Sequence, residues 1–235
     1  MSDATVERPL NLAEHAYQRI KAQLFDLKLL PGEDFTEGQV VEALGVSRTP
    51  VRQALQRLAR EGFVQVHRRS GWRVRPFDFD RYEHLYDLRI VLELAAVSRL
   101  CVMPDAADSP VLRRLLDEWS VPEAQRLPAS REAARLDEAF HCALVAAAGN
   151  PEMAAVHLDV TEKISVVRRL DFTKAARVDA TYEEHLAILH AIRKRRADTA
   201  CTLLRAHIEM SKSEVRKITI HNLYAARDGG GWLEG

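Results

Sequence analysis

The stretch Thr36-Glu-Gly-Gln-Val-Val-Glu-Ala-Leu-Gly-Val-Ser-Arg-Thr-Pro-Val-Arg-Gln-Ala-Leu55 predicts two short helices joined by a tight turn. Thr36 and Gln39 have the spacing of a capping box, which starts a helix. Gly45 suits the left-handed residue that ends a helix, and Ser47 suits the N-cap of the next one. The spacing therefore predicts a helix-turn-helix motif.

The second of these helices has two different sides. Val51, Leu55 and Leu58 recur at spacings of four and three residues, which predicts that they face the core. The remaining sides carry polar and basic residues, namely Arg48, Thr49, Arg52, Gln53 and Gln56. A helix of this kind is typical of the recognition helix that enters the major groove of DNA.

The residues after this helix predict a wing. Residues 63–67 and 72–75 alternate apolar and polar side chains, as half-buried strands do. The segment Arg68-Arg69-Ser70-Gly71 between them can form the loop of a hairpin. With an amphipathic helix predicted over residues 12–27, residues 1–76 are expected to form a winged helix-turn-helix DNA-binding domain.

Charge is distributed unevenly along the chain. The whole chain has 34 basic and 34 acidic residues, and residues 1–76 hold 12 basic and 9 acidic ones, a net charge of +3. Residues 45–76 contain eight arginines and one glutamate, a net charge of +7. Because the whole chain is neutral and residues 1–76 carry +3, residues 77–235 carry −3. A basic block of this kind suits a polyanion. A solvated helix face could carry the same charge, so charge alone does not decide between the two.

Beyond Phe77 the strand pattern disappears. Apolar periodicity and Pro or Gly breaks predict helices at about 79–102, 107–119, 130–148, 152–175, 179–195 and 197–222. The glycine-rich tail, residues 223–235, is expected to be flexible. The predicted fold is therefore mainly α, with the N-terminal winged helix-turn-helix followed by an all-α antiparallel helical bundle over residues 77–222.

Composition excludes several classes of protein. Hydrophobic residues make up 47% and charged residues 29% of the chain, which is ordinary for a globular protein. No apolar run approaches the roughly 18 residues of a membrane span, and the first residues lack the apolar core of a signal peptide, so we expect a cytoplasmic protein. The three cysteines form no CxxC pair, and no GxGxxG, GxxxxGK[ST] or GxSxG motif is present, so no enzyme is predicted.

Four residues of the predicted bundle have the pattern of a metal site. Asp137 and His141 are four residues apart on one predicted helix, which puts both on one face, as two ligands of one ion require. If the last two helices form a hairpin about Ala197, His185 and His207 lie 12 and 10 residues from the turn, at similar heights. Three imidazoles and a carboxylate suit Zn, Ni, Fe or Mn. The alternative is that these are separate core histidines bonded to neighbouring groups.

The chain resembles the GntR family of bacterial transcription regulators, in the subfamily with a FadR-type C-terminal domain, called FCD. Gly45–Leu55 matches that family's helix-turn-helix signature, and residues 58–64 match its lead into the wing. The DNA-contacting positions of the family fall here on Ser47, Arg48, Thr49 and Arg52, with Arg68, Arg69 and Gly71 in the wing. Two positions depart from the family pattern. Gly38 stands where some members have a DNA-contacting arginine, and Gln53 replaces the usual glutamate.

The resemblance extends to the second domain. Asp137, His141, His185 and His207 match the FCD pattern, including the ligands of its metal-binding members. The resemblance implies a homodimer that binds a palindromic double-stranded DNA operator and releases it when a small carboxylate metabolite enters the FCD cavity. Arg89 is the candidate second anchor for that carboxylate, and the alternative for Arg89 is a surface ion pair with Glu93.

Two other functions compete with this interpretation. A metal-dependent hydrolase with an accessory nucleic-acid domain would need a general base near the metal, and the motifs offer none beyond the ligands themselves. A helical protein-interaction module would bind neither a metal nor an effector.

Overall fold

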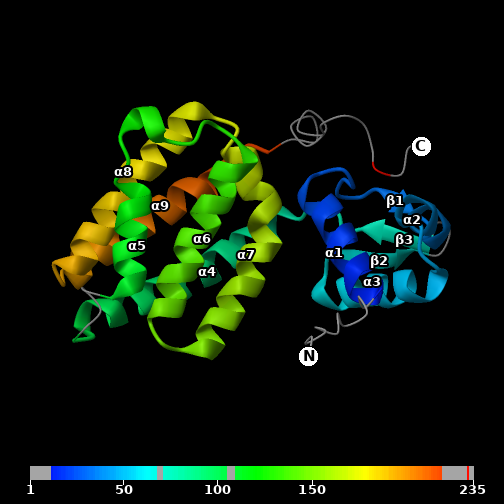
Figure 1. Cartoon of the computed structure of the whole chain (residues 1–235), viewed down its shortest axis with the longest axis horizontal. Helices are drawn as coiled ribbons and strands as arrows, with labels where there is room; N and C mark the ends of the chain where they lie inside the picture. The colour runs from blue at the N-terminus through cyan, green and yellow to red at the C-terminus, as the bar shows by residue number, and fades with distance from the viewer. Residues whose placement is uncertain (1–11, 68–70, 105–108, 219–231, 233–235) are drawn as a thin grey trace, which may run out of the picture. The chain divides into compact units, whose positions relative to one another are not determined.

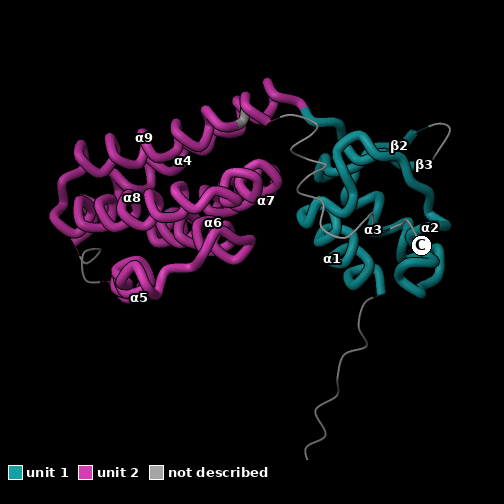
Figure 2. Tube along the Cα trace, turned by 90° about the horizontal axis from the view of Figure 1, so that it is seen from above, with its two compact units in different colours: residues 1–77, 220–235 teal, residues 78–219 magenta. Residues whose placement is uncertain are grey.

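A computed structural model describes residues 12–67, 71–104, 109–218 and Trp232. The chain divides into two compact units, residues 1–77 with 220–235 and residues 78–219 (Figure 2). In the described part of the chain, no helix has the length and apolar character that crossing a membrane requires.

The first unit is a winged helix-turn-helix, and the predicted fold class is confirmed (Figure 1). Its sheet has the order β1-β3-β2 with antiparallel neighbours. The short strand β1 was not predicted, because two residues are too few to show a periodic pattern. The elements are α1 (Leu12–Phe25), β1 (Asp34–Phe35), α2 (Glu37–Leu44), α3 (Arg48–Glu61), β2 (Val64–His67) and β3 (Gly71–Val74).

The turn between α2 and α3 has the predicted chemistry. The Gln39 backbone N–H donates to Thr36 Oγ1 at 3.2 Å, and the Thr36 N–H donates to Gln39 Oε1 at 2.8 Å, which confirms the capping box. Gly45 ends α2 with a φ of 65°, in the left-handed region that favours glycine. Ser47 is the N-cap of α3, although its side chain makes no capping hydrogen bond.

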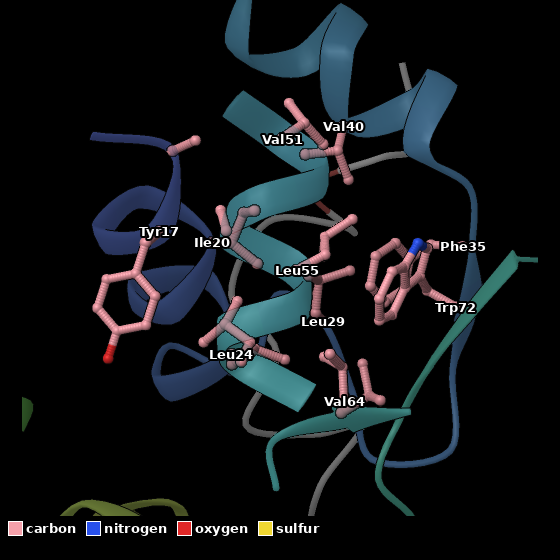
Figure 3. Close-up of a cluster of buried hydrophobic side chains, with 14 residues drawn as sticks. Tyr17, Ile20, Leu24, Leu29, Phe35, Val40, Val51, Leu55, Val64 and Trp72 are labelled. Carbon is pink, nitrogen blue, oxygen red and sulfur yellow. The ribbon is translucent and has the colours of Figure 1, made fainter. Parts of the chain in front are cut away.

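One apolar core joins α1, α3 and the sheet (Figure 3). Ile20 of α1, Val51 and Leu55 of α3, and Phe35 of β1 are each at most 1% exposed. Trp232 packs against this core, and its backbone N–H donates to the Lys28 carbonyl at 3.3 Å. Apart from Trp232, the predicted flexible tail lies outside the described residues. The core holds α3 with its polar side facing away from it.

The second unit consists of helices, so the predicted all-α bundle is confirmed as a fold (Figure 1). Side chains that cap the helix starts help set the bounds, as Ser130 does by accepting the Ala133 N–H. The elements are α4 (Phe79–Val102), α5 (Pro110–Trp119), the short 3-10 helix η2 (Glu123–Gln125), α6 (Arg131–Ala147), α7 (Pro151–Asp171), α8 (Ala175–Arg193) and α9 (Ala197–Val215).

Two predicted helix ends are wrong. The helices predicted at 152–175 and 179–195 meet earlier, because α7 ends at Asp171 and α8 begins at Ala175. The break contains neither Gly nor Pro, so the sequence carries no strong stop signal there. The last helix was predicted to reach residue 222, but α9 ends at Val215. Within the bundle, α4 packs against α6, α7 and α9, and α8 packs against α9.

Candidate functional site

The outer side of α3 is exposed and polar. Its predicted DNA-contacting residues and the N-cap, Ser47, Arg48, Thr49 and Arg52, all lie on the surface. Three of these, Arg48, Thr49 and Arg52, line a shallow concave surface together with Gln53 and Gln56. The helix therefore presents hydrogen-bond donors and two guanidinium groups to whatever approaches it.

Arg52 is held by a carboxylate of the preceding helix. Its Nε and Nη2 donate to Glu37 Oε1 and Oε2 at 3.0 and 2.9 Å, a bidentate pair. The hydrogen bond from Arg52 lowers the pKa of Glu37. The Arg52 side chain is 59% exposed and that of Glu37 is 22% exposed, so the pair lies at the surface. The remaining N–H groups of Arg52 stay available to a ligand.

The wing is anchored by its strands. Gly71 begins β3 with a φ of 87°, opposite His67 of β2. Arg73 of β3 forms a bidentate pair with Asp34 of β1, at 2.5 Å from Nε to Oδ1 and 2.8 Å from Nη2 to Oδ2. Arg68 and Arg69, the other predicted wing residues, lie outside the described residues.

The second unit brings the four predicted metal-ligating residues together. Asp137 and His141 come from α6, His185 from α8 and His207 from α9. One donor atom from each lies within 4.8 Å of all the others. The Nε2 atom of His207 is 3.1 Å from that of His141 and 3.3 Å from that of His185. Asp137 Oδ1 is 3.3 to 3.8 Å from the three Nε2 atoms.

These separations fit the donor set of one ion. Donor atoms bound at about 2.0–2.1 Å lie about 2.8–3.0 Å apart at adjacent octahedral positions and about 3.3–3.4 Å apart at tetrahedral ones, which is close to the separations found here. All four side chains are at most 3% exposed, and Asp137 Oδ1 has no hydrogen-bond partner. A buried carboxylate oxygen that faces imidazole nitrogens without a partner is costly unless a cation sits between them. The residues present therefore fit a divalent transition metal.

Carboxylates fix the orientation of two of the imidazoles. The Nδ1–H of His141 donates to Glu93 Oε2, and the Nδ1–H of His207 donates to Glu184 Oε2, both at 2.6 Å. With the proton on Nδ1, each ring turns an unprotonated Nε2 toward the centre, as ligation requires. The His185 ring is stacked on Phe140, with centroids 3.6 Å apart. These contacts hold the rings in place before any ion binds.

Burial and neighbouring charges keep Asp137, His185 and His207 in the protonation states that a metal needs. Burial lowers the pKa of His207 to about 4 and that of His185 well below its usual range. Burial alone would raise the pKa of Asp137, but Arg168 and the neighbouring His141 hold it well below its usual range. At neutral pH the imidazoles of His185 and His207 are therefore neutral, and Asp137 is a carboxylate.

Arg89 forms the ion pair with Glu93 that was the alternative to an effector anchor, but the pair is buried and not on the surface as that alternative had it. Both side chains are 1% exposed, and Arg89 Nε donates to Glu93 Oε1 at 2.6 Å. The same carboxylate oxygen accepts from His157 Nε2 at 2.9 Å. Burial would raise the pKa of Glu93, but Arg89 and His141 hold it well below its usual range. Arg89 thus contacts the metal-ligand cluster through Glu93, while its Nη2 has no hydrogen-bond partner.

Several residues that shape this site were not predicted. Arg168 of α7 donates from Nη2 to Asp137 Oδ2 and is 2% exposed. Arg177 of α8 donates from Nη1 to Glu184 Oε2 at 2.8 Å. Glu184 precedes His185 directly, so its place was visible in the sequence. Arg168 belongs to a line of polar residues on one side of α7, and this line could have indicated its role. The apolar residues of the same helix made the line hard to recognise in the sequence.

Comparisons with known proteins agree on one family. The FCD domain matches residues 84–210, and the bacterial regulatory proteins of the gntR family match residues 12–74. The Nta operon transcriptional regulator of Aminobacter aminovorans is 32% identical over 188 residues, covering 80% of this chain and 87% of that one. The probable HTH-type transcriptional regulator LgoR of Escherichia coli K12 is 31% identical over 212 residues, which cover 84% of this chain and 66% of LgoR.

The fold also matches a solved structure. E. coli McbR/YncC superposes with a TM-score of 0.67 at 18% identity, covering 89% of this chain and 99% of that one. At this identity the likeness concerns the fold alone.

Proposed function

The chain belongs to the GntR family of bacterial transcription regulators and carries an FCD domain, and from that premise we propose how its operator affinity is controlled. A small carboxylate metabolite binds beside a divalent transition metal in the second unit and weakens binding of the first unit to DNA. The relatives and families matched are transcription regulators rather than enzymes, so the hydrolase alternative is not supported.

The first unit would contact DNA through α3 and the wing. The proposed contacts of α3 are Ser47, Arg48, Thr49 and Arg52. Their exposure on a helix whose opposite side is buried in the core supports this role. Arginine forks can read guanine edges or bind phosphates. Arg68, Arg69 and Gly71 are the proposed wing contacts. A regulator that binds chromosomal DNA in a bacterium acts in the cytoplasm.

The metal would be bound by Asp137, His141, His185 and His207. The observation that carries this proposal is the unpartnered Asp137 Oδ1 among three buried imidazole nitrogens. The ion would be Zn, Ni, Mn or Fe, which accept mixed imidazole and carboxylate ligands. A bound metal supplies a positive charge that attracts a carboxylate. Arg89 Nη2, which has no hydrogen-bond partner, is the proposed second anchor for that carboxylate.

The regulator would act as a homodimer on a palindromic operator. The outer side of α4 supports dimerisation, because Leu88, Val91 and Val102 are 40%, 64% and 72% exposed there. Such an exposed apolar line on one helix is typical of an interface. Replacing Val91 with Glu should therefore yield a monomer by light scattering.

Operator binding tests the proposal in the first unit. An operator selected from random double-stranded DNA should lose affinity by about 1–3 kcal/mol on Arg52→Ala if Arg52 reads a base. Arg60→Ala removes the same charge from the other end of α3 and should leave the selected operator's affinity nearly intact. Equal losses of operator affinity in the two variants would contradict base readout by Arg52.

Calorimetry tests the regulatory part. Metal analysis should find a transition metal, and a carboxylate found by thermal-shift screening should bind more weakly when operator is present. Linkage requires the operator and the effector to weaken each other by the same factor. Equal effector affinity with and without operator would contradict regulation through this site.

A further inference from the structure

Trp232, near the C-terminal end of the chain, packs on the DNA-binding unit. It follows three glycines, Gly229–Gly231, in a segment that was predicted to be a flexible tail. Its side chain is half-buried against the apolar core of the first unit, and its backbone N–H donates to the Lys28 carbonyl at 3.3 Å. A large aromatic side chain that leaves water in this way stabilises the contact that it makes.

The turn after α1 forms the receiving surface. Helix α1 ends at Phe25, and the backbone N–H groups of Lys28 and Leu29 both donate to the Gln23 carbonyl, at 3.0 and 3.2 Å. Leu29 is 1% exposed, and Figure 3 shows its side chain among those of the core. These contacts fix the backbone of the turn, so the Lys28 carbonyl is held in the position in which it accepts from Trp232.

The same turn holds Leu27 in an unusual backbone conformation. Its φ is 56°, in the left-handed region, and its side chain is 3% exposed. A bulky residue persists in this conformation only where the surrounding structure fixes it, and such residues cluster where proteins bind something. The Trp232 contact therefore lies on a rigid turn.

The other end of the tail is fixed to the second unit. Helix α9 ends at Val215, and Arg216 Nη2 donates to Glu83 Oε2 of α4 at 2.9 Å. One turn earlier Lys212 forms an ion pair with Asp87 of α4, and the two helices pack along one another. The tail therefore leaves the second unit from a helix end that α4 holds in place.

The chain consequently crosses between the two units twice. Residues 1–77 and 220–235 belong to the first unit and residues 78–219 to the second. Trp232 is fourteen residues beyond Ile218, the last residue that the structure describes before it. A short tether gives its end an effective concentration on the order of millimolar. A contact made by one aromatic side chain and one hydrogen bond is then formed most of the time, yet it opens readily.

We propose that Trp232 docks reversibly on the turn after α1 and makes the tail a second connection between α9 and the DNA-binding unit. While Trp232 is docked, the first unit is held by this connection as well as by the chain segment 75–78, so its freedom to reorient is reduced. The inference goes beyond the proposed function, because it involves neither the metal, nor the effector, nor the operator.

Hydrogen exchange of the Trp232 amide with water, followed by NMR on the full-length protein, tests the docking. The reference is a synthetic peptide of residues 226–235. The amide should exchange about fivefold more slowly in the protein than in the peptide, as expected for a contact that is formed about 80% of the time. Equal exchange rates would overturn the docking.

Variants of Trp232 test the restraint on the first unit. In Trp232→Ala, amide-nitrogen relaxation should show that α3 tumbles faster than in the wild type, while the tumbling of α8 in the second unit is unchanged. Trp232→Phe keeps an aromatic ring and should retain most of the restraint. Leu12→Ala is the matched control, because it shortens an apolar side chain of the same unit that is 53% exposed. Unchanged tumbling of α3 in Trp232→Ala, or an equal change in Leu12→Ala, would overturn the second connection.

A monomer distinguishes the chain's own tail from that of a second copy. In the Val91→Glu variant, which should be a monomer, the Trp232 amide should keep its slow exchange because the tail docks on its own chain. Fast exchange in that monomer would place Trp232 on the partner subunit and would overturn docking within one chain.

Discussion

The two units use the pairing of arginine and carboxylate in opposite surroundings. In the first unit Arg52 and Glu37 form a fork at the surface, where the arginine is 59% exposed. In the second unit Arg89 and Glu93 form the same pair with both side chains 1% exposed. Among the described residues, the second unit buries three arginines and three carboxylates, whereas the first buries only one charged side chain, Lys21.

The comparison shows that the contribution of an ion pair depends on whether the pair is exposed or buried. An exposed pair contributes about 0–1 kcal/mol and is screened by salt, so Arg52 can exchange Glu37 for another anion at little cost. A buried pair is no better for stability than apolar packing, yet breaking it is costly. The interior charges of the second unit are therefore best explained by the groups that they hold, His141 and Asp137 among them.

The largest expected effect comes from breaking the buried pair. Glu93→Ala leaves Arg89 unpaired in the interior and should destabilise the second unit by about 3–5 kcal/mol. Glu37→Ala, the matched change in the exposed pair, should lower the stability of the first unit by at most about 1 kcal/mol. Native-state hydrogen exchange measures the two units separately. Similar losses in both units would show that burial does not distinguish the pairs.

The next largest effect is the acid sensitivity of the metal-free second unit. The His207 pKa is about 4 when folded and 6.5 in the unfolded reference, because burial disfavours the charged imidazole. Between these values the unfolded state binds more protons. The contribution of His207 to stability is therefore fully present above about pH 6.5 and falls toward pH 4, by about 1.4 kcal/mol per pH unit.

Chelated protein and hydrogen exchange across this range check the slope. His207→Gln removes the titrating group and should flatten it by about that amount. An unchanged slope in this variant would assign the acid sensitivity to other groups.

A smaller effect is expected from the carboxylate that orients His207. Glu184→Gln keeps the shape of the side chain but weakens the hydrogen bond to His207 Nδ1, and such changes weaken metal binding about 10- to 100-fold. Glu183→Gln is the matched control, because Glu183 is the preceding residue, 66% exposed and paired with Arg126. Competition with a coloured chelator measures both affinities. A loss shared by the two variants would point to net charge rather than orientation.

The winged helix-turn-helix was predictable because its signals are local. Thr36 with Gln39, and Gly45, fix the ends of α2 through contacts within a few residues, and the structure shows these caps. The break between Asp171 and Ala175 was misplaced because no residue there forbids a helix. Local chemistry therefore determines the first unit more fully than the second.

The donor set was predictable for a different reason. Asp137 and His141 share a face by helical periodicity, and a hairpin aligns His185 with His207, so short-range geometry sufficed. Glu93, which orients His141, lies 48 residues away on α4. Which helix packs beside α6 depends on the whole bundle, and a single sequence carries no local signal for that.

The smallest expected effect concerns the exposed pair and DNA. Glu37→Gln removes a negative charge near the phosphates and releases the guanidinium of Arg52, so affinity for random DNA should rise by less than about 1 kcal/mol. Glu42→Gln removes the same charge from an exposed position of α2 and serves as the control. Fluorescence anisotropy at two salt concentrations separates the contributions, since both gains should shrink as salt rises.

The gain from Glu37→Gln should exceed that from Glu42→Gln, and the preference for operator over random DNA should fall, because a freed arginine binds phosphate without a fixed orientation. Equal gains in the two variants would mean that Glu37 does not orient Arg52.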